Sequence, residues 1–137
     1  MADVIKLIET DHREVEGLFA QFKQDRSKRT AMAICQELDA HAAAEEAVFY
    51  PVVRDEVPEG GKLAGEGEKE HGEARALIGR IKNTDDPDHL AELVTELEQA
   101  VSHHVQEEES EMLPKSREAL GQKRLDELGQ EFDAAKG

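Results

Sequence analysis

Apolar residues recur along this chain at alternating intervals of three and four positions, with polar residues between them. This spacing places them on one face of an α-helix, so the sequence predicts four amphipathic helices. Each of these faces also contains a histidine, and two contain a glutamate. The face positions are Ile5, Ile8, His12, Val15, Phe19 and Phe22; Ile34, Leu38, His41, Glu45, Val48 and Val52; Ala64, Gly67, His71, Ala74, Ile78 and Ile81; and Leu90, Val94, Leu97, Val101, His104, Glu108 and Met112.

Short polar segments separate the four predicted helices. Residues 24–28 lie between the first two, and residues 58–61 (PEGG) form a connector before the third. Residues 85–87 (DDP) supply capping acids and a proline suited to a first turn before the fourth. Because proline lacks an N–H, we expect Pro51 to bend or end the second helix and the fourth helix to end near Pro114.

These elements predict an all-α fold, an up-down-up-down antiparallel four-helix bundle with a short additional C-terminal helix. We expect residues 1–114 to form the bundle from two helical hairpins, 1–57 and 61–114. Facing apolar stripes would then form the core, and the histidines and glutamates on those stripes would be buried with it.

A fifth amphipathic helix is predicted within residues 115–137, where Leu125, Leu128 and Phe132 share one face. This helix is expected to pack on the bundle or to lie at a dimer contact. The pattern does not choose between the two, so a monomer and a homodimer both stay open.

Length and composition narrow the class of protein. A chain of 137 residues fits one compact domain, and its formal net charge of −15 works against a nucleic-acid or anionic-membrane partner. No apolar run approaches the roughly eighteen residues of a membrane span, so we expect a soluble, cytoplasmic protein. The single cysteine, Cys35, excludes an intramolecular disulfide and is expected in the core.

One motif, H-x-x-x-E-E-x-x-x-x-P, occurs twice. It reads HAAAEEAVFYP at residues 41–51 and HVQEEESEMLP at residues 104–114, an offset of 63 positions (104 − 41). The helices before the two copies also correspond, because DHRE at residues 11–14 resembles EHGE at residues 70–73 with an offset of 59 (71 − 12). The chain therefore reads as a doubled helical hairpin.

Histidine and glutamate four positions apart lie about 40° apart around a helix and about 6 Å along it, so they can serve one site. Buried carboxylates persist only when they are paired, hydrogen-bonded or bound to metal. No lysine or arginine occupies the apolar faces, which leaves a metal site or a metal-free core in which histidine and glutamate pair with each other. Imidazole and carboxylate without thiolate suit iron, manganese or zinc, and six ligands favour two ions over one.

The succession of His12, HAAAE at residues 41–45, His71 and HVQEE at residues 104–108 resembles the hemerythrin-like, or HHE cation-binding, family over residues 1 to about 114. Ferritin-like di-iron bundles use E-x-x-H instead. The resemblance implies a non-haem centre of two iron ions bridged by an oxo or hydroxo group and by two carboxylates, Glu45 and Glu108. Manganese and zinc are the alternative metals. The expected metal ligands are His12, His41, Glu45, His71, His104 and Glu108.

Members of this family bind oxygen, sense oxygen or iron, or react with peroxide or nitric oxide, so these small molecules are the expected partners. Oxygen-carrying hemerythrins have H-x-x-x-H on the third helix, whereas this chain has an arginine, Arg75, four residues after His71. The missing fifth histidine leaves a coordination position open, which favours redox turnover of peroxide, oxygen or nitric oxide over reversible oxygen carriage. An iron- or oxygen-sensing or storage module without turnover is the alternative.

Other polar residues beside the motif carry weaker predictions. Tyr50 lies nine residues after His41, about 180° around an ideal helix, so we expect it to point away from the site unless a kink at Pro51 turns it. Acidic runs usually face solvent, although any member can hydrogen-bond a ligand imidazole. The acidic residues concerned are Glu46, Glu107, Glu109 and Glu111.

Overall fold

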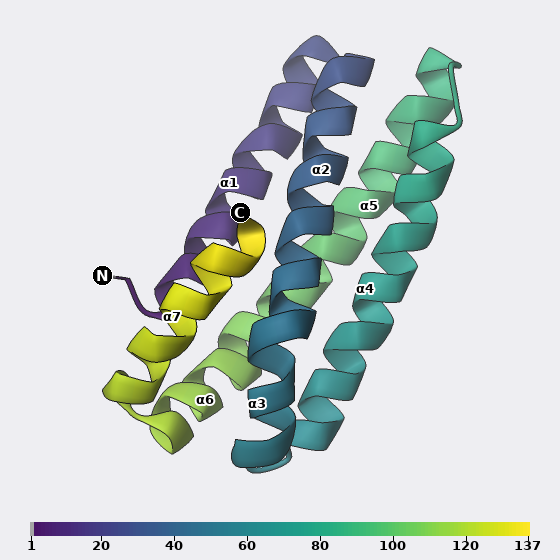
Figure 1. Cartoon of the computed structure of the whole chain (residues 1–137). Helices are drawn as coiled ribbons and strands as arrows, with labels where there is room; N and C mark the ends of the chain where they lie inside the picture. Colours follow the sequence, from purple (N-terminus) through teal and green to yellow (C-terminus); the bar gives the residue numbers. More distant parts are fainter. Residues whose placement is uncertain (1) are drawn as a thin grey trace.

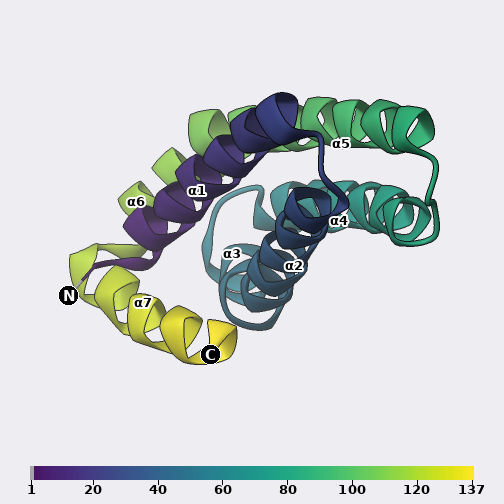
Figure 2. The same cartoon turned by 90° about the horizontal axis from the view of Figure 1, so that it is seen from above.

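The computed structural model describes residues 2–137 and is all-helical over that range, as the sequence predicts. Four long helices lie side by side and alternate in direction along the chain, and a further helix lies outside them (Figures 1 and 2). Within residues 2–137, no helix is long and apolar enough to span a membrane. The elements are α1 (Val4–Asp25), α2 (Lys28–Ala44), the π-helical turn η1 (Glu45–Phe49), α3 (Tyr50–Glu56), α4 (Gly60–Lys82), α5 (Pro87–Glu107), the π-helical turn η2 (Glu108–Met112), α6 (Leu113–Leu120) and α7 (Gln122–Lys136).

Capping side chains define the starts of three long helices. The carboxylate of Asp3 accepts a hydrogen bond from the N–H of Lys6 at 2.8 Å, and Asp86 accepts one from His89 at 2.8 Å. Ser27 caps α2 in the same way. Each cap satisfies a backbone donor that has no partner within the helix, which fixes where the helix begins.

The two prolines of the repeated motif do not end their helices. The prediction that the fourth helix ends near Pro114 was wrong, and of the two outcomes expected at Pro51, a bend or an end, the structure contradicts the end. The helical path continues beyond Pro51 as α3 to Glu56, and beyond Pro114 as α6 to Leu120. A π-helical turn precedes each proline-containing segment. The wider turn relieves the clash between a proline ring and the carbonyl four residues earlier, so the chain passes the proline without breaking.

The apolar core consists of two clusters. One, which we call the proximal core, joins the start of α1 to α3, α6 and α7; the other, the distal core, joins the far ends of the four long helices. The proximal core includes Val4, Ile5, Ile8, Phe49, Tyr50, Val53, Leu113, Leu125, Leu128 and Phe132. The distal core includes Val15, Phe19, Phe22, Ile34, Cys35, Ile78, Ile81, Leu93, Leu97 and Val101.

Helix α7 lies across α1, α2 and η1 (Figures 1 and 2). Leu125, Leu128 and Phe132 are at most 1% exposed, so the predicted apolar face packs on the bundle of its own chain. Gly129 allows this close approach, because a Cβ there would lie 2.5 Å from the carbonyl oxygen of Ala2. The helix therefore packs tightly against the start of α1.

Candidate metal centre

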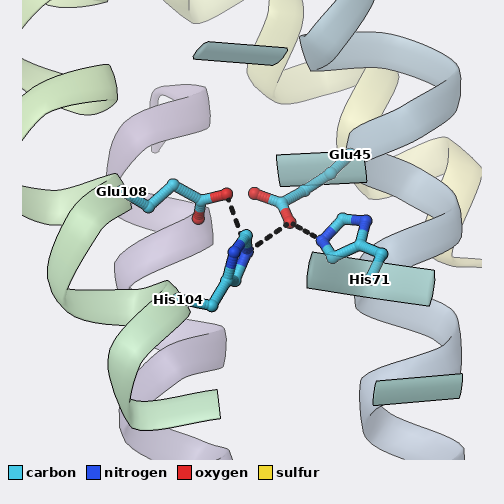
Figure 3. A group of neighbouring side chains, drawn as sticks. All are labelled: Glu45, His71, His104 and Glu108. Atoms are coloured by element: carbon cyan, nitrogen blue, oxygen red, sulfur yellow. Dashed lines mark hydrogen bonds and ion pairs between the residues drawn. The ribbon is translucent and has the colours of Figure 1, made fainter. Parts of the chain in front are cut away.

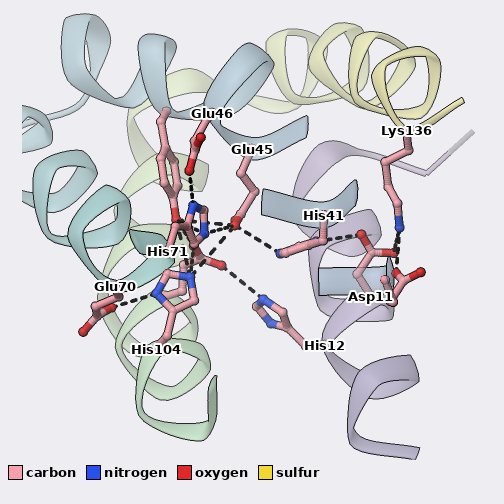
Figure 4. Close-up of polar contacts among 12 residues, drawn as sticks. Asp11, His12, His41, Glu45, Glu46, Glu70, His71, His104 and Lys136 are labelled. Atoms are coloured by element: carbon pink, nitrogen blue, oxygen red, sulfur yellow. Dashed lines mark hydrogen bonds and ion pairs between the residues drawn. The ribbon is translucent and has the colours of Figure 1, made fainter. Parts of the chain in front are cut away.

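Six polar side chains meet in the middle of the bundle, between the proximal and distal cores (Figures 3 and 4). Each long helix contributes one histidine, and each π-helical turn begins with one glutamate. All six residues are buried, with at most 9% of the surface of any one exposed. They are the six that the sequence predicts to gather: His12, His41, Glu45, His71, His104 and Glu108.

The two glutamates occupy the centre of this group. Oε1 of Glu45 lies 3.1 Å from Nε2 of His41 and 3.0 Å from Nε2 of His71. The two oxygens of Glu108 face different histidines, with Oε1 3.1 Å from Nε2 of His12 and Oε2 3.1 Å from Nε2 of His104. All four histidines therefore direct the same ring nitrogen, Nε2, toward the centre.

The outward nitrogen, Nδ1, of each histidine contacts a carboxylate of its own. The distances are 2.7 Å for His12 to Glu109, 2.7 Å for His41 to Asp11, 2.6 Å for His71 to Glu46 and 2.7 Å for His104 to Glu70. Such contacts favour the tautomer that has its proton on Nδ1 and leave the lone pair of Nε2 free to bind a metal.

These outer carboxylates follow the sequence repeat, and the sequence pattern predicts only half of them. Glu46 and Glu109 each follow a motif glutamate and had been considered as partners of a ligand imidazole. Asp11 and Glu70 were missed. The available signal was an acidic residue directly before the first-helix histidine in both copies of the repeat.

A basic side chain contacts each outer carboxylate in turn. Arg75 donates two hydrogen bonds of 3.0 Å to Glu46, and Arg13 pairs with Glu109. His103 lies 3.4 Å from Glu70, and Nζ of Lys136 lies 2.9 Å from Asp11. Three of these side chains come from the bundle helices, whereas Lys136 comes from the last turn of α7 (Figure 4).

Tyr50 lies inside the site, so the prediction that it points away was wrong. Its hydroxyl donates a hydrogen bond of 2.6 Å to Glu108 and lies 3.3 Å from Nε2 of His71 and 3.4 Å from Nε2 of His104. The π-helical turn η1 adds roughly one residue before Tyr50, which reduces its angle from His41 from about 180° to about 80°. The additional residue in this turn therefore brings the phenol inward.

A glycine on α4 makes room for this phenol. A Cβ at Gly67 would lie 2.6 Å from the Tyr50 hydroxyl, closer than van der Waals contact allows. The ring also stacks on His71, with centroids 5.2 Å apart and planes 15° apart. Tyr50 is thus fixed by close packing on one face and by a charged acceptor at its tip.

The close contacts oppose the effect of burial on protonation. Burial raises the pKa of Glu45, but the charge on His41 and contacts with three histidines hold it well below its ordinary value. Burial lowers the pKa of His41, but Glu45 and Asp11 raise it to about 10. Burial and the charges of Glu108 and Glu45 together raise the pKa of Tyr50 well above its ordinary value, so the phenol keeps its proton.

A cavity reaches all four histidines from the distal side of the site. The volume open to the centre of a water-sized sphere is about 40 Å³, enough for a few waters or one small molecule. Acidic and basic side chains, among them Glu37, Asp39 and Arg75, also border it. Most of its wall is apolar and consists of Val15, Leu38, Ala42, Ala74, Ile78 and Val101.

The site meets the requirements of a metal centre on two grounds. Four inward atoms are buried and form no hydrogen bond of good geometry, although three of them lie 3.1 Å from a facing imidazole or carboxylate: Nε2 of His12, Nε2 of His41, Oε2 of Glu45 and Oε1 of Glu108. Donor atoms also fall into two sets, each within 4.8 Å. The four-residue set is Glu45, His71, His104 and Glu108, and the three-residue set is His12, His41 and Glu108.

These features define a cation-binding helical domain, and comparison with known proteins identifies its family. The hemerythrin HHE cation binding domain matches residues 3–116, so the chain belongs to that family. A hemerythrin HHE cation binding domain-containing protein from Mycobacterium kansasii shares the fold, with a TM-score of 0.84 and 20% identity over 99% of this chain and 86% of that one.

A longer protein from Nostoc sp. (strain PCC 7120), described as a DNA nickase, is 32% identical over 144 aligned positions. The match spans 98% of this chain but 38% of the Nostoc protein. The present chain therefore corresponds to little more than a third of that relative.

Proposed function

We propose that this chain is a di-iron protein whose metal ligands are the six central residues, each histidine binding through Nε2. The observation that supports this most strongly is the convergence of six buried donors, four atoms of which lack a hydrogen bond. Unsatisfied buried polar atoms are costly, and a bound cation would compensate them. The ligands are His12, His41, Glu45, His71, His104 and Glu108.

Two ions fit the donors better than one. The donors form two sets that share Glu108, and the two oxygens of Glu108 face histidines of different sets. A carboxylate placed in this way is suited to bridge two cations. The Tyr50 hydroxyl lies beside the four-residue set, where it contacts Glu108, His71 and His104.

Iron is the proposed metal, with manganese and zinc as alternatives. Imidazole and carboxylate donors suit all three, and the six protein ligands exceed the four that a single zinc ion normally takes. The only cysteine, Cys35, lies in the distal core and contributes no thiolate. Iron would supply the ability to accept and return electrons.

The proposed reaction is turnover of a small oxygen species: peroxide, oxygen or nitric oxide. The cavity has room for such a molecule beside the histidines, and its mostly apolar wall suits uncharged ones. Disproportionation of hydrogen peroxide is the most economical choice, because two molecules give two waters and one oxygen without an external reductant. Arg75 stands where a fifth histidine would close the site and instead pairs with Glu46.

Within this proposal the chain's own residues position charge and protons. The outer carboxylates fix the histidine rings, which is the usual role of such partners in metal sites. Tyr50 retains its proton and donates it in a hydrogen bond to Glu108, so that carboxylate is held at a fixed angle. The cavity limits how much water reaches the histidines.

A sensing or storage module without turnover is the second candidate. It is favoured by the contact of α7 with the site, because a helix packed over a ligand can report its state. We further expect no nucleic-acid partner, because the net charge of −15 opposes a phosphate backbone. The nicking activity named for the Nostoc relative is therefore not transferred to this chain.

Elemental analysis of desalted protein tests the metal, and a peroxide assay tests the reaction. We expect about two irons per chain and oxygen release from peroxide. In His104→Ala, which lacks one donor of the four-residue set, about one iron and the oxygen release should be lost. About two irons with no oxygen release and no consumption of nitric oxide would favour the sensor. One zinc per chain, or no metal that rebinds, would contradict the di-iron proposal.

A further inference from the structure

We propose that Lys136 is a positioning residue for the three-residue set, acting on His41 through Asp11, and that packing of α7 and metal binding at that set strengthen each other. The inference rests on the proposed function, since it concerns the affinity of the same metal centre. It adds a residue outside the bundle that controls one half of that centre.

A continuous series of contacts links the last turn of α7 to one of the two central glutamates, Glu45 (Figure 4). Nζ of Lys136 lies 2.9 Å from Oδ1 of Asp11. The other oxygen of Asp11 lies 2.7 Å from Nδ1 of His41, and Nε2 of His41 lies 3.1 Å from Glu45. Because the lysine and the histidine contact different oxygens of one carboxylate, the lysine fixes the angle at which that carboxylate meets the imidazole.

The contact between Lys136 and Asp11 is largely shielded from solvent. The side chain of Lys136 is 20% exposed and that of Asp11 is 11% exposed, so solvent screens this pair less than a surface ion pair. Lys136 also contacts Glu37 at 2.8 Å, which places its ammonium between two carboxylates. The position of the ammonium is therefore well defined.

A second contact from α7 reaches the same histidine. The ring of Phe132 meets the His41 ring edge-on, with centroids 6.0 Å apart. Phe132 is 1% exposed and belongs to the proximal core, so its position depends on how α7 packs. Any shift of α7 would thus move two groups that hold His41.

The other three outer carboxylates do not depend on α7. Arg13, Arg75 and His103 lie on α1, α4 and α5, the helices that also carry metal ligands. The outer carboxylates of His71 and His104 are contacted by side chains of the bundle helices, whereas the outer carboxylate of His41 is contacted by Lys136 of α7. Coupling between two sites is reciprocal, so a metal ion that fixes His41 must also favour the packed position of α7.

Anaerobic calorimetric titration of the metal-free full chain with ferrous ion tests the effect on affinity. In Lys136→Met we expect one of two binding steps to weaken about 10-fold, the lower end of the range for partners of metal ligands, while the other changes less than twofold. Lys136→Arg should restore the step. Lys123→Met, an exposed position on the same helix, is the matched control and should change neither.

Hydrogen exchange of α7 amides provides a second readout that does not depend on turnover. We expect iron to slow exchange in α7 of the unmodified chain, and to slow it less in Lys136→Met. If the unmodified chain binds two irons and Lys136→Met binds them with the same affinities, the positioning role is overturned and the di-iron proposal stands. If the unmodified chain binds no metal, the di-iron proposal itself fails, and this inference fails with it.

Discussion

The two hairpins supply equivalent histidines and glutamates but differ in what packs beside them. Tyr50 in the first hairpin corresponds to Leu113 in the second, at the offset of 63 that relates the two motif copies. Gly67 in the second corresponds to Ile8 in the first, at the offset of 59. One pair is a phenol packed on a glycine, and the other is two aliphatic side chains of the proximal core.

Duplication of the histidines and glutamates therefore does not make the two halves of the site equal. The phenol lies beside the four-residue set, and α7 reaches the three-residue set. The four-residue set thus has a phenol from within the bundle beside it, and the three-residue set has a contact from α7, outside the bundle. The predictions below test the comparison, beginning with the residue that both sets share.

Loss of Glu108 should have the largest effect, because this residue belongs to both donor sets. We expect Glu108→Ala to reduce bound iron from about two per chain to none, whereas His12→Ala should retain about one at the four-residue set. Elemental analysis after desalting measures both, with circular dichroism to verify helix content. Equal iron contents in the two variants would show that the sets are not distinct.

The pH dependence of stability should distinguish the metal-free chain from the metal-bound one. The folded state raises the pKa of His41 to about 10, so its contribution is complete below the ordinary value of 6.5 and is lost as pH rises through about 10. We therefore expect the thermal midpoint of the metal-free chain to fall between pH 7 and 10. A bound metal replaces the proton at Nε2, so the loaded chain should show little decline over that interval.

For the central glutamates, the contribution to stability changes with pH in the opposite direction. Their pKa values are lowered in the folded chain, so their contribution is present above the ordinary value of 4.5 and is lost as pH falls below it. A metal-free chain whose midpoint rises steadily from pH 7 to 10 would contradict the ionised histidine–glutamate pairs described above. Differential scanning calorimetry at several pH values measures the thermal midpoint of the metal-free and the metal-bound chain.

Removal of the Tyr50 hydroxyl should have an intermediate effect on the metal-free chain. Tyr50→Phe leaves Glu108 without its shortest hydrogen bond, and bonds to charged groups contribute about 1.5–3 kcal/mol. Urea unfolding of Tyr50→Phe, Glu108→Gln and the double variant gives the coupling between the two groups. A coupling close to zero would mean that the phenol does not support the carboxylate.

The smallest expected effect tests the fit between the phenol and the glycine. Gly67→Ala should destabilise the chain by about 1–3 kcal/mol, because the added methyl group overlaps Tyr50. Gly65→Ala is the matched control on the same helix, where a Cβ meets nothing within 4 Å, and should stabilise by about 0.5–1 kcal/mol. Urea unfolding measures both, and shifts of the same sign would contradict the close contact.

The sequence was sufficient for the helices and for the six central residues because both depend on spacing alone. Periodicity of three and four places His41 and His104 on buried faces, and the repeat shows that the faces belong together. The assignment of these six residues as metal ligands stays a proposal. The spacing of residues predicts the direction in which each side chain points from a regular helix.

The remaining features depend on departures from a regular helix or on contacts between distant segments. The turn η1 contains one more residue than an α-helical turn, and the segment EEAVF gives no sequence signal for a π-helical turn. Tyr50 was therefore predicted on the helix face that points away from the site. Lys136 meets Asp11 across 125 positions (136 − 11), a separation that no local pattern encodes. The roles of Asp11 and Glu70 could have been predicted from the sequence, because both residues directly precede a repeated histidine.

The division of the apolar core by a charged layer has a consequence for how the chain opens. The proximal and distal cores share no buried side chain, and the layer between them consists of histidines and carboxylates. Segments with few common apolar contacts tend to behave as separate cooperative units in hydrogen exchange. We expect the distal ends of the four long helices to exchange as one unit and the proximal ends with α7 as another. A metal ion held by residues from all four helices would join the two units. Its binding would then make the two units unfold and exchange their amide hydrogens together, as a single cooperative unit.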